Sequence, residues 1–443
     1  MYHIIVNYLS DCKDTPRDIW IGFFHLVYVD KPDDLQVVLN NSSALQKSRV
    51  YNFFRRALGE GLLTAPVSKW RKKRRLISPL FSTKFVLNYM NVFNSHSSEL
   101  VKRLKNYCDT NEHFDLWIPV SKTTLAMIWE VAVGKDVDMT EKVKDNLLEA
   151  FVKIWMYPIV MYKLYASIAG YSKYFDLADT LPKQILESKK QKFKQKIDLI
   201  KENGEESVTL SYMDQFLKYN EEGAKLTDKE IIYEANTMLA ASSETNALTI
   251  SFTLIMLAMN PKIQEKVYHE IVEFSGEEDR DVSIEEVQQM SYLEQCIRET
   301  LRLFPPIPFT LREVTKTFQL NNNFTIQENS NVIIPILMVH RNPNIYPNPM
   351  QWNPDNFAPE KVERRHKYSF LAFSGGARGC IGGKYAILAI KVSLMKILKN
   401  YRLETDYTMN DIKLRLEIVM RSASGYKIKI YSRRENRNFH CPK

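Results

Sequence analysis

The sequence predicts a mainly helical protein with small β-sheets attached, which is an α+β fold. Three observations support this class. Helical periodicity runs from about residue 66 to 300, short strand patterns with Asn-rich turns follow Pro305, and no linker or repeat interrupts the 443 residues. We therefore expect a single domain over residues 1–443.

The elements at the two ends of the chain are less regular. The stretch WIGFFHLVYVDKPDDLQVVLNN, which starts at Trp20, predicts a strand, a turn at Pro32 and a short helix. After the helical region, TFQLNNNFTIQENSNVIIPI predicts short strands. The segment LRLEIVMRSASGYKIKIYSR predicts a C-terminal hairpin with lysines alternating on one side.

One long helix is expected in the middle of the chain. Thr227 and Glu230 form a capping-box signature, and helical character continues to Pro261, over about 32 residues. The second half is apolar on all sides and should be buried. Its centre nevertheless carries Glu244 beside Thr245, where an unpaired charge is expensive to bury. These polar residues either bond a neighbouring helix or have a function.

Charge indicates the kind of partner, while cysteine spacing and the length of uncharged stretches argue against a disulfide framework, a zinc site and a membrane span. The chain has 61 Lys and Arg against 52 Asp and Glu, a net charge of +9 that favours an anionic membrane, a nucleic acid or an acidic protein. The basic residues are scattered, as on solvated helix faces. The five cysteines lie far apart without C-x-x-C spacing, which argues against a disulfide framework or zinc site and for a reducing compartment. The longest uncharged stretch, Thr245 to Pro261, is shorter than the ~20 residues of a membrane span.

The stretch FSGGARGCIGGK, Phe373 to Lys384, concentrates five of the 14 glycines around one cysteine. A phosphate loop would need glycine where Arg378 stands and Ser or Thr where Tyr385 follows Lys384. A dinucleotide-binding loop would need G-x-G-x-x-G directly after a strand, but this stretch lacks that spacing and lies late in the chain. Both chemistries are therefore excluded for this loop.

A thiolate ligand for haem iron is the remaining use of such a loop. Cys380 precedes the periodic run KYAILAIKVSLMKILKN, so it lies just before a helix N-terminus, which favours thiolate over thiol. A lone cysteine beside glycines is otherwise a small buried side chain. The pattern F-x-x-G-x-R-x-C-x-G decides between them, and it is matched by Phe373, Gly376, Arg378, Cys380 and Gly382. On this match the chain resembles the cytochrome P-450 superfamily, and the resemblance implies haem b with Cys380 as the metal ligand.

Two further motifs extend the resemblance. Glu299 and Arg302, in ETLR, match the E-x-x-R pair, which in the family forms a buried ion pair that supports the cysteine loop. The segment WNPDNF, Trp352 to Phe357, resembles F-x-P-E-R-F, but Asn356 stands in place of the usual arginine. We therefore expect the Glu299 and Arg302 pair to be held differently here, since its third charge is missing.

The resemblance also implies which residues hold the haem carboxylates. Trp70 and Arg74, in WRKKRR, match the W-x-x-x-R pair that contacts a propionate, and Arg312 and Arg378 would supply further contacts. Taken alone, RKKRR is a solvated basic face or a nucleic-acid patch. With the other motifs we expect Arg74 to point inward and its neighbours to remain surface charges: Arg71, Lys72, Lys73 and Arg75.

The polar centre of the long helix has a counterpart in the family. The residues ASSETN, from Ala241, resemble A-G-x-[DE]-T-[TS] of the oxygen-binding helix. The resemblance implies that Glu244 is the acid of a proton relay and Thr245 the hydroxyl that steers protons to dioxygen. Ser242 replaces the family glycine and Asn246 its second hydroxyl residue, which changes the expected kink and water path.

The implied activity is monooxygenation of a hydrophobic small molecule. Because the chain has no nucleotide-binding motif, its electrons would come from a separate protein. By resemblance this donor is NADPH-cytochrome P-450 reductase, with a contribution from cytochrome b5. No nucleic-acid partner is expected.

The segments ETLRLFPPIPF and HRNPNIYPNP resemble the animal clan that contains the fatty-acid ω-hydroxylases. Many of those carry a glutamate that esterifies the haem where Ala241 stands here, so we expect no covalent haem link.

The resemblance implies the cytosolic face of the endoplasmic reticulum membrane. Members of that clan begin with a membrane anchor, whereas this chain starts near the first strand, so we expect the anchor to be missing. The stretch Ile154 to Phe175 is rich in tyrosine and contains Trp155, which favours a peripheral membrane contact. Core packing is the alternative explanation for these aromatic residues.

Two other functions remain open. One is a catalytically impaired haem-thiolate protein that binds a ligand without turnover, which Ser242, Asn246 and Asn356 favour and Glu244 and Thr245 oppose. The other is an isomerase or dehydratase on the same scaffold, which needs no reductase. Branches of the family with that chemistry often lack the relay threonine, so Thr245 argues against it.

Overall fold

The computed structural model describes residues 15–21, 24–135, 172–203, 209–321, 323–417 and 419–433. The chain divides into two compact units. Unit 1 contains residues 1–49, 97–118 and 247–443, and unit 2 contains residues 50–96 and 119–246. The expected stretch Ile154 to Phe175 lies outside the residues whose side chains are described.

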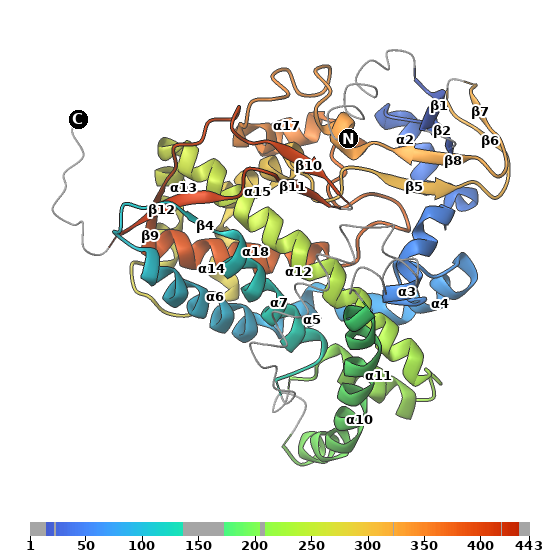
Figure 1. Cartoon of the computed structure of the whole chain (residues 1–443), viewed down its shortest axis with the longest axis horizontal. Coiled ribbons are helices and arrows are strands. Elements are labelled where there is room, and N and C mark those ends of the chain that lie inside the picture. Colours follow the sequence, from blue (N-terminus) through green and yellow to red (C-terminus); the bar gives the residue numbers. More distant parts are fainter. Residues whose placement is uncertain are drawn as a thin grey trace. The chain divides into compact units, whose positions relative to one another are not determined.

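Unit 1 contains a five-stranded sheet in the order β1-β2-β8-β5-β3. Figure 1 labels the first four of these strands. The strands of the sheet are β1 (Arg17–Ile21), β2 (Phe24–Tyr28), β3 (Gln46–Lys47), β5 (Thr310–Glu313) and β8 (Asn331–Ile334). β2 pairs in parallel with β8, whereas β5 pairs antiparallel with both β8 and β3. The last pairing places Lys47 opposite Arg312.

Helix α2 (Pro32–Asn40) packs on this sheet and closes a small core. Pro32 stands at the first helical turn, where its missing N–H has no helical partner to lose. Leu35 and Val38 lie one turn apart and are completely buried with Val27 and Val332 of the sheet. The sequence therefore predicted this helix correctly, although its proline begins the helix instead of marking a separate turn.

The expected N-terminal strand is a hairpin. β1 and β2 pair antiparallel, with Ile21 opposite Phe24, so only two residues connect them. The Gly-Phe pair between the strands is a sequence signal for such a short connection. The continuous apolar run concealed it, because both strands are rich in apolar and aromatic residues.

The remaining sheets of unit 1 are small. They comprise β6 (Phe318–Gln319) with β7 (Thr325–Ile326), β10 (Leu414–Leu416) with β11 (Met420–Ser422), and β4 (Phe114–Asp115), β12 (Lys427–Ser432) and β9 (Tyr401–Glu404) in the order β4-β12-β9. The predicted C-terminal hairpin is correct only for β10 and β11. β12 instead pairs with β4 and β9, because Gly425, at a φ of +79°, turns the chain away after β11.

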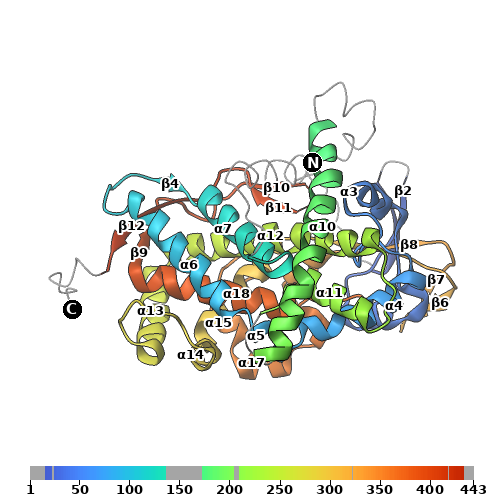
Figure 2. The ribbon, with the colours of Figure 1, turned by 90° about the horizontal axis from the view of Figure 1, so that it is seen from below.

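Unit 1 also contains α18 (Gly383–Asn400), whose second half is buried, and five shorter helices. They are α13 (Pro261–Ser275), α14 (Ile284–Gln289), α15 (Ser291–Leu303), α16 (Ile336–His340) and α17 (Pro359–Arg364). Helices α13, α14 and α15 each contact α18 (Figure 2). This packing fixes the helix that follows the glycine-rich loop.

Unit 2 is helical where it is described. It contains α3 (Arg55–Leu58), α4 (Val67–Ile77), α5 (Thr83–Leu87), α10 (Ser172–Asn203) and α11 (Tyr212–Glu221), with most of α7 (Trp117–Ala132) and the first turns of α6 (Met90–Leu104). Tyr89 and Tyr212 pack edge to face, with ring centroids 5.8 Å apart, between α5 and α11. The Tyr89 hydroxyl donates to the Leu210 carbonyl at 2.8 Å.

The long central helix is confirmed as α12 (Asp228–Met259), which passes from unit 2 into unit 1. Its capping box forms as predicted, since the Glu230 amide donates to Thr227 Oγ1 at 3.2 Å and the Thr227 amide to Glu230 Oε2 at 3.1 Å. Leu254 and Leu257, in the apolar half, are completely buried. No helix among the described residues is long and apolar enough to span a bilayer.

Candidate active site

The glycine-rich loop folds back on itself and presents its cysteine. The Cys380 amide donates to the Phe373 carbonyl at 2.8 Å, and the Gly379 amide to the Gly376 carbonyl at 3.0 Å. Gly376 has a φ of +65°, and a Cβ there would lie 1.9 Å from the carbonyl oxygen of Leu39. Cys380 is exposed, forms no disulfide and lies three residues before Gly383, where α18 begins. The loop therefore holds an accessible sulfur at a helix N-terminus.

Three cationic side chains converge beside this loop in unit 1, and we call them the cation cluster: Lys47, Arg312 and Arg378. Arg378 Nε donates to the Leu45 carbonyl at 3.0 Å, and the Arg312 guanidinium donates to Thr310 Oγ1 at 2.8 Å. Both arginines are buried. Sequence analysis identified the two arginines, but it missed Lys47.

Lys47 joins the cluster because β3 pairs with β5. Its Nζ donates to Thr310 Oγ1 at 3.2 Å. Desolvation, with added repulsion from Arg312 and Arg378, holds the pKa of Lys47 well below its usual range. A set of crowded cations fits a carboxylate ligand such as a haem propionate, whose charge relieves the repulsion. A two-residue strand has no periodicity, so no sequence pattern could place Lys47 here.

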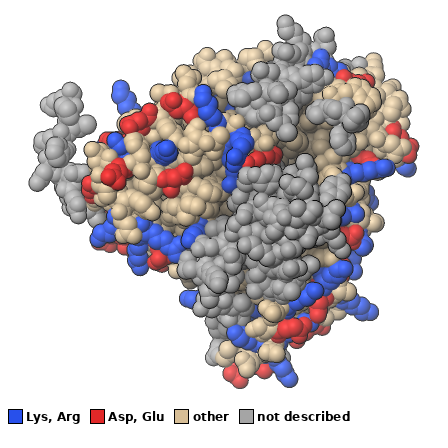
Figure 3. Space-filling view, in the orientation of Figure 1, with Lys and Arg blue, Asp and Glu red and all other residues tan. Residues whose placement is uncertain are grey.

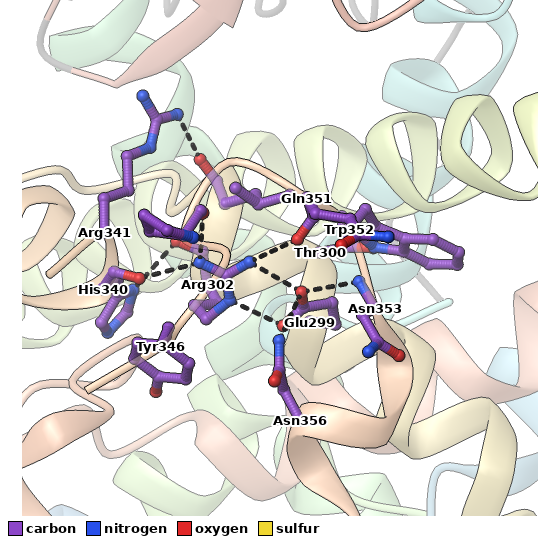
Figure 4. Close-up of polar contacts among 12 residues, drawn as sticks. Glu299, Thr300, Arg302, His340, Arg341, Tyr346, Gln351, Trp352, Asn353 and Asn356 are labelled. Atoms are coloured by element: carbon purple, nitrogen blue, oxygen red, sulfur yellow. Dashed lines mark hydrogen bonds and ion pairs between the residues drawn. The ribbon is translucent and has the colours of Figure 1, made fainter. Parts of the chain in front are cut away.

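The E-x-x-R pair forms a completely buried ion pair on α15 (Figure 4). Arg302 donates to both carboxylate oxygens of Glu299 at 2.7 Å, in a bidentate arrangement. Its remaining N–H groups donate to three main-chain carbonyls: His340 at 2.9 Å, Pro349 at 2.7 Å and Gln351 at 2.9 Å. The guanidinium therefore binds α15 to the segments on both sides of the 341–348 loop.

Asn356 takes part in this network without a charge. Its side-chain amide and the Asn353 main-chain amide both donate to Glu299 Oε1, at 3.1 and 2.8 Å (Figure 4). Arg365 donates to the Asn356 carbonyl at 2.5 Å and lies 4.4 Å from the centre of the Tyr346 ring. The Arg302 guanidinium lies 4.8 Å from the same ring. As expected, the Glu299 and Arg302 pair is held differently: neutral amide donors stand where a third charge would, and Arg365 contacts the network only through the Tyr346 ring and the Asn356 carbonyl.

In unit 2, α4 carries the predicted tryptophan and arginine. Trp70 is 5% exposed and Arg74 is half-buried. The expectation that Lys73 remains a surface charge is wrong, because its Nζ bonds Glu234 Oε1 of α12 at 2.7 Å and it is 5% exposed. Lys73 follows Trp70 by three residues and so shares its buried helix face. This geometry was available from the sequence, but the distant partner that makes burial tolerable was not.

Glu234 also anchors the loop before α4. Its Oε2 accepts from the Leu62 amide at 2.9 Å, and burial raises the pKa of Glu234 despite the neighbouring Lys73. A Cβ on Gly61 would lie 2.0 Å from Thr237 Oγ1, one turn along α12. Helix α12 therefore holds both the loop and α4.

The predicted relay residues lie further along α12. Glu244 is 8% exposed, and Thr245 is half-buried, with its Oγ1 donating to the Ala241 carbonyl at 2.7 Å. Thr124 of α7 donates to the Ser243 carbonyl at 2.8 Å. A contact with a neighbouring helix thus exists at this point, as the structural alternative expected, but Thr124 bonds the main chain and leaves the functional alternative open.

The predicted site residues are divided between the units. Unit 1 carries Glu299, Arg302, Arg312, Asn356, Phe373, Gly376, Arg378, Cys380 and Gly382, and unit 2 carries Trp70, Arg74, Glu244 and Thr245. On the described part of the face drawn in Figure 3, Lys and Arg are interspersed with Asp and Glu. Such a mixed surface is typical of solvated helices.

Comparison with known proteins assigns the family. A family model described as "Cytochrome P450" matches residues 2–430. "Cytochrome P450 4c21" of Blattella germanica is 31% identical over 422 residues, which cover 92% of this chain and 84% of that protein. "Cytochrome P450 4V2" of Homo sapiens is 27% identical over 447 residues, which cover 97% and 85%.

The fold agrees with this assignment. The structure titled "Crystal structure of cytochrome P450DA heme domain" has a TM-score of 0.82 at 20% identity, covering 99% of this chain and 94% of that one. The predicted family, fold class, enzyme class and haem cofactor are thereby confirmed, while the roles of individual residues stay predictions. The chain belongs to the cytochrome P450 family and is a monooxygenase that uses a cysteine-ligated haem b.

Proposed function

We propose that this protein inserts one oxygen atom of dioxygen into a lipophilic small molecule, with Cys380 as the haem ligand. The observation that carries the proposal is the accessible Cys380 sulfur in a closed glycine loop, beside the cation cluster. Bound haem supplies the oxygen-transfer chemistry. The chain supplies the thiolate, which the N-terminus of α18 stabilises through the helix dipole.

The other residues hold carboxylates and move protons. Lys47, Arg312 and Arg378 would bind a haem propionate, and the resemblance assigns propionate binding to Trp70 and Arg74 as well. Glu244 supplies protons, and Thr245 holds one at Oγ1. In the resting helix that hydroxyl donates to the Ala241 carbonyl, from which it must turn to act.

Electrons come from a separate protein, for which we propose an NADPH-cytochrome P450 reductase with cytochrome b5 as a second donor. The net charge of +9 favours acidic partners of this kind. A peripheral position on the cytosolic face of the endoplasmic reticulum follows from the same resemblance.

The activity is tested by reconstitution with the reductase, NADPH and ¹⁸O₂ on a panel of fatty acids, terpenoids and steroids. Monooxygenation places one labelled oxygen atom in the product and requires the reductase. A substrate-type binding spectrum without product would favour a ligand-binding protein. Product that forms without reductase or label would favour an isomerase or dehydratase.

Thr245→Ala is expected to leave haem binding intact and to lower product formed per NADPH by about tenfold, with peroxide released instead, because the protons lose their hydroxyl donor. Peroxide, NADPH and product are measured together. Thr253→Ala is the matched control, since Thr253 makes the same bond to the carbonyl four residues earlier, at 2.7 Å to Thr249. Unchanged coupling in Thr245→Ala would show that Thr245 is not in the relay.

Lys47→Met is expected to stabilise the haem-free protein and to weaken haem retention in the haem-bound protein. The pKa of Lys47 is lowered on folding, so stability of the haem-free protein falls as pH drops below the ordinary lysine pKa. Removing the charge should therefore raise the unfolding free energy of that form by about 1 kcal/mol. In the loaded protein, loss of a propionate partner should speed haem release by roughly tenfold.

Haem transfer to an apoglobin measures the release rate, and thermal unfolding measures stability. Lys316→Met, at an exposed position of unit 1, is the control. Haem release at the unmodified rate would remove Lys47 from the propionate site.

A further inference from the structure

His340 is a buried histidine at the end of α16 that the proposed mechanism does not use. Its exposed fraction is 0%. Figure 4 shows it beside Arg302, at the edge of the network around Glu299. Its position between this network and the segment that leads to Cys380 suggests a connecting role.

Both ring nitrogens of His340 contact the main chain. The Leu371 amide donates to Nε2 at 2.7 Å, and Nδ1 lies 3.2 Å from the Arg302 carbonyl oxygen. The His340 carbonyl in turn accepts from the Arg302 guanidinium at 2.9 Å. The Phe370 ring stacks on the imidazole, with centroids 5.1 Å apart. One side chain therefore joins the end of α15 to the start of the segment that carries Cys380.

These contacts determine the form of the imidazole. Nε2 must be unprotonated to accept from an amide, and Nδ1 must carry hydrogen to donate to a carbonyl, so only the neutral Nδ1–H tautomer satisfies both. Burial, with the charges of Arg302 and Arg341, lowers the pKa of His340 to about 3. The Glu299 carboxylate that could oppose this effect is bound bidentately by Arg302.

A short series of main-chain bonds leads from His340 to the cysteine. The Leu371 carbonyl accepts from the Ser374 amide at 2.7 Å, and the Phe373 carbonyl accepts from the Cys380 amide at 2.8 Å. The segment is thus closed by its own bonds between residues 371 and 380. His340 binds the first amide of that closed segment.

We propose that His340 is a positioning residue for the haem ligand, which fixes the cysteine loop to the Glu299 and Arg302 ion pair through its two ring nitrogens. This inference rests on the proposed role of Cys380. It predicts that the acceptor at Nε2, and not the volume of the ring, is what the loop requires.

Two substitutions distinguish the role of the His340 Nε2 acceptor from that of the ring volume. His340→Phe keeps a ring of similar size and removes both hydrogen bonds, whereas His340→Gln keeps an acceptor within reach of the Leu371 amide. His269→Phe, at an exposed position on α13, is the control. The measurements are the thiolate-type Soret band of the reduced carbonyl complex and hydrogen exchange of the segment that contains Leu371.

In His340→Phe we expect exchange at Leu371 to accelerate about fivefold to tenfold. The fraction of haem with the thiolate-type band should fall at least about twofold in the same variant, because the loop no longer holds the sulfur in one place. His340→Gln should restore most of both signals. Equal losses in the Phe and Gln variants, or no loss in either, would overturn the proposal.

The unmodified protein provides a second test that does not depend on folding of a variant. Its ¹⁵N-histidine spectrum, assigned with His340→Gln, should show one neutral Nδ1–H ring that does not titrate between about pH 5 and 8. A ring that titrates there, or the Nε2–H tautomer, contradicts the inference. Absence of the thiolate-type band from the unmodified protein would instead contradict the role of Cys380, so the two failures are distinguishable.

Discussion

Cys380→Ser is expected to abolish the thiolate-type Soret band of the reduced carbonyl complex and all reductase-dependent product formation. A serine hydroxyl is not deprotonated at neutral pH and cannot replace the thiolate as a strong electron donor to iron. The loop itself should survive, because its closing bonds come from the main chain of residues 373–380. Optical spectra and haem content of the purified protein measure the effect.

The other described cysteines serve as controls. Cys108 is half-buried, and Cys296 is fully buried, where desolvation raises the pKa of its thiol well above the usual range. Serine at either position should leave the band unchanged, with a modest loss of stability for the buried site. A Cys380→Ser protein with the unmodified spectrum would refute the assignment of the ligand.

Arg302→Leu is expected to lower the free energy of unfolding by about 3–5 kcal/mol, because it leaves the Glu299 carboxylate buried without its charged partner. Three main-chain carbonyls lose a donor in the same change. Denaturant unfolding measures the loss. We also expect the variant to retain little haem when it is purified, since the network around the cysteine loop is removed.

The matched control lies on the same helix. Arg298 pairs with Glu294 one turn earlier on α15, at 2.6 Å, but the Arg298 side chain is 40% exposed. Exposed pairs of this kind contribute about 1 kcal/mol or less, so Arg298→Leu should be nearly neutral. Similar losses in the two variants would mean that burial does not set the strength of the Arg302 pair.

The sequence predicted the features that depend on local spacing. The capping box of Thr227 and Glu230 marked the start of α12, and the three-residue spacing of Glu299 and Arg302 placed both on one helix face. Such features are determined within one or two helical turns.

The missed features depend on contacts between distant segments. Lys47 enters the cation cluster through the pairing of β3 with β5. Lys73 is buried because it forms an ion pair with Glu234, which lies 161 residues away in the sequence. His340 meets Leu371 only after α16 packs beside the loop. Neither a periodicity nor a motif encodes these contacts, since each requires the tertiary fold.

Asn356 is an intermediate case. The missing arginine was visible in the sequence, but its replacement was not. The Asn356 side chain and the Asn353 amide donate to Glu299, and Arg365, nine residues from Asn356, contacts the network through an aromatic ring and a main-chain carbonyl. The substitution therefore does not by itself indicate an impaired enzyme.

The buried Lys73 and Glu234 pair restricts how this protein can diverge. Neutralising either partner alone leaves the other as an isolated charge away from water, whereas replacing both with apolar side chains removes both charges and costs mainly the acceptor that Glu234 offers to the Leu62 amide. Positions 73 and 234 should therefore covary among descendants of this chain. A substitution at one position should be tolerated only together with a compensating substitution at the other.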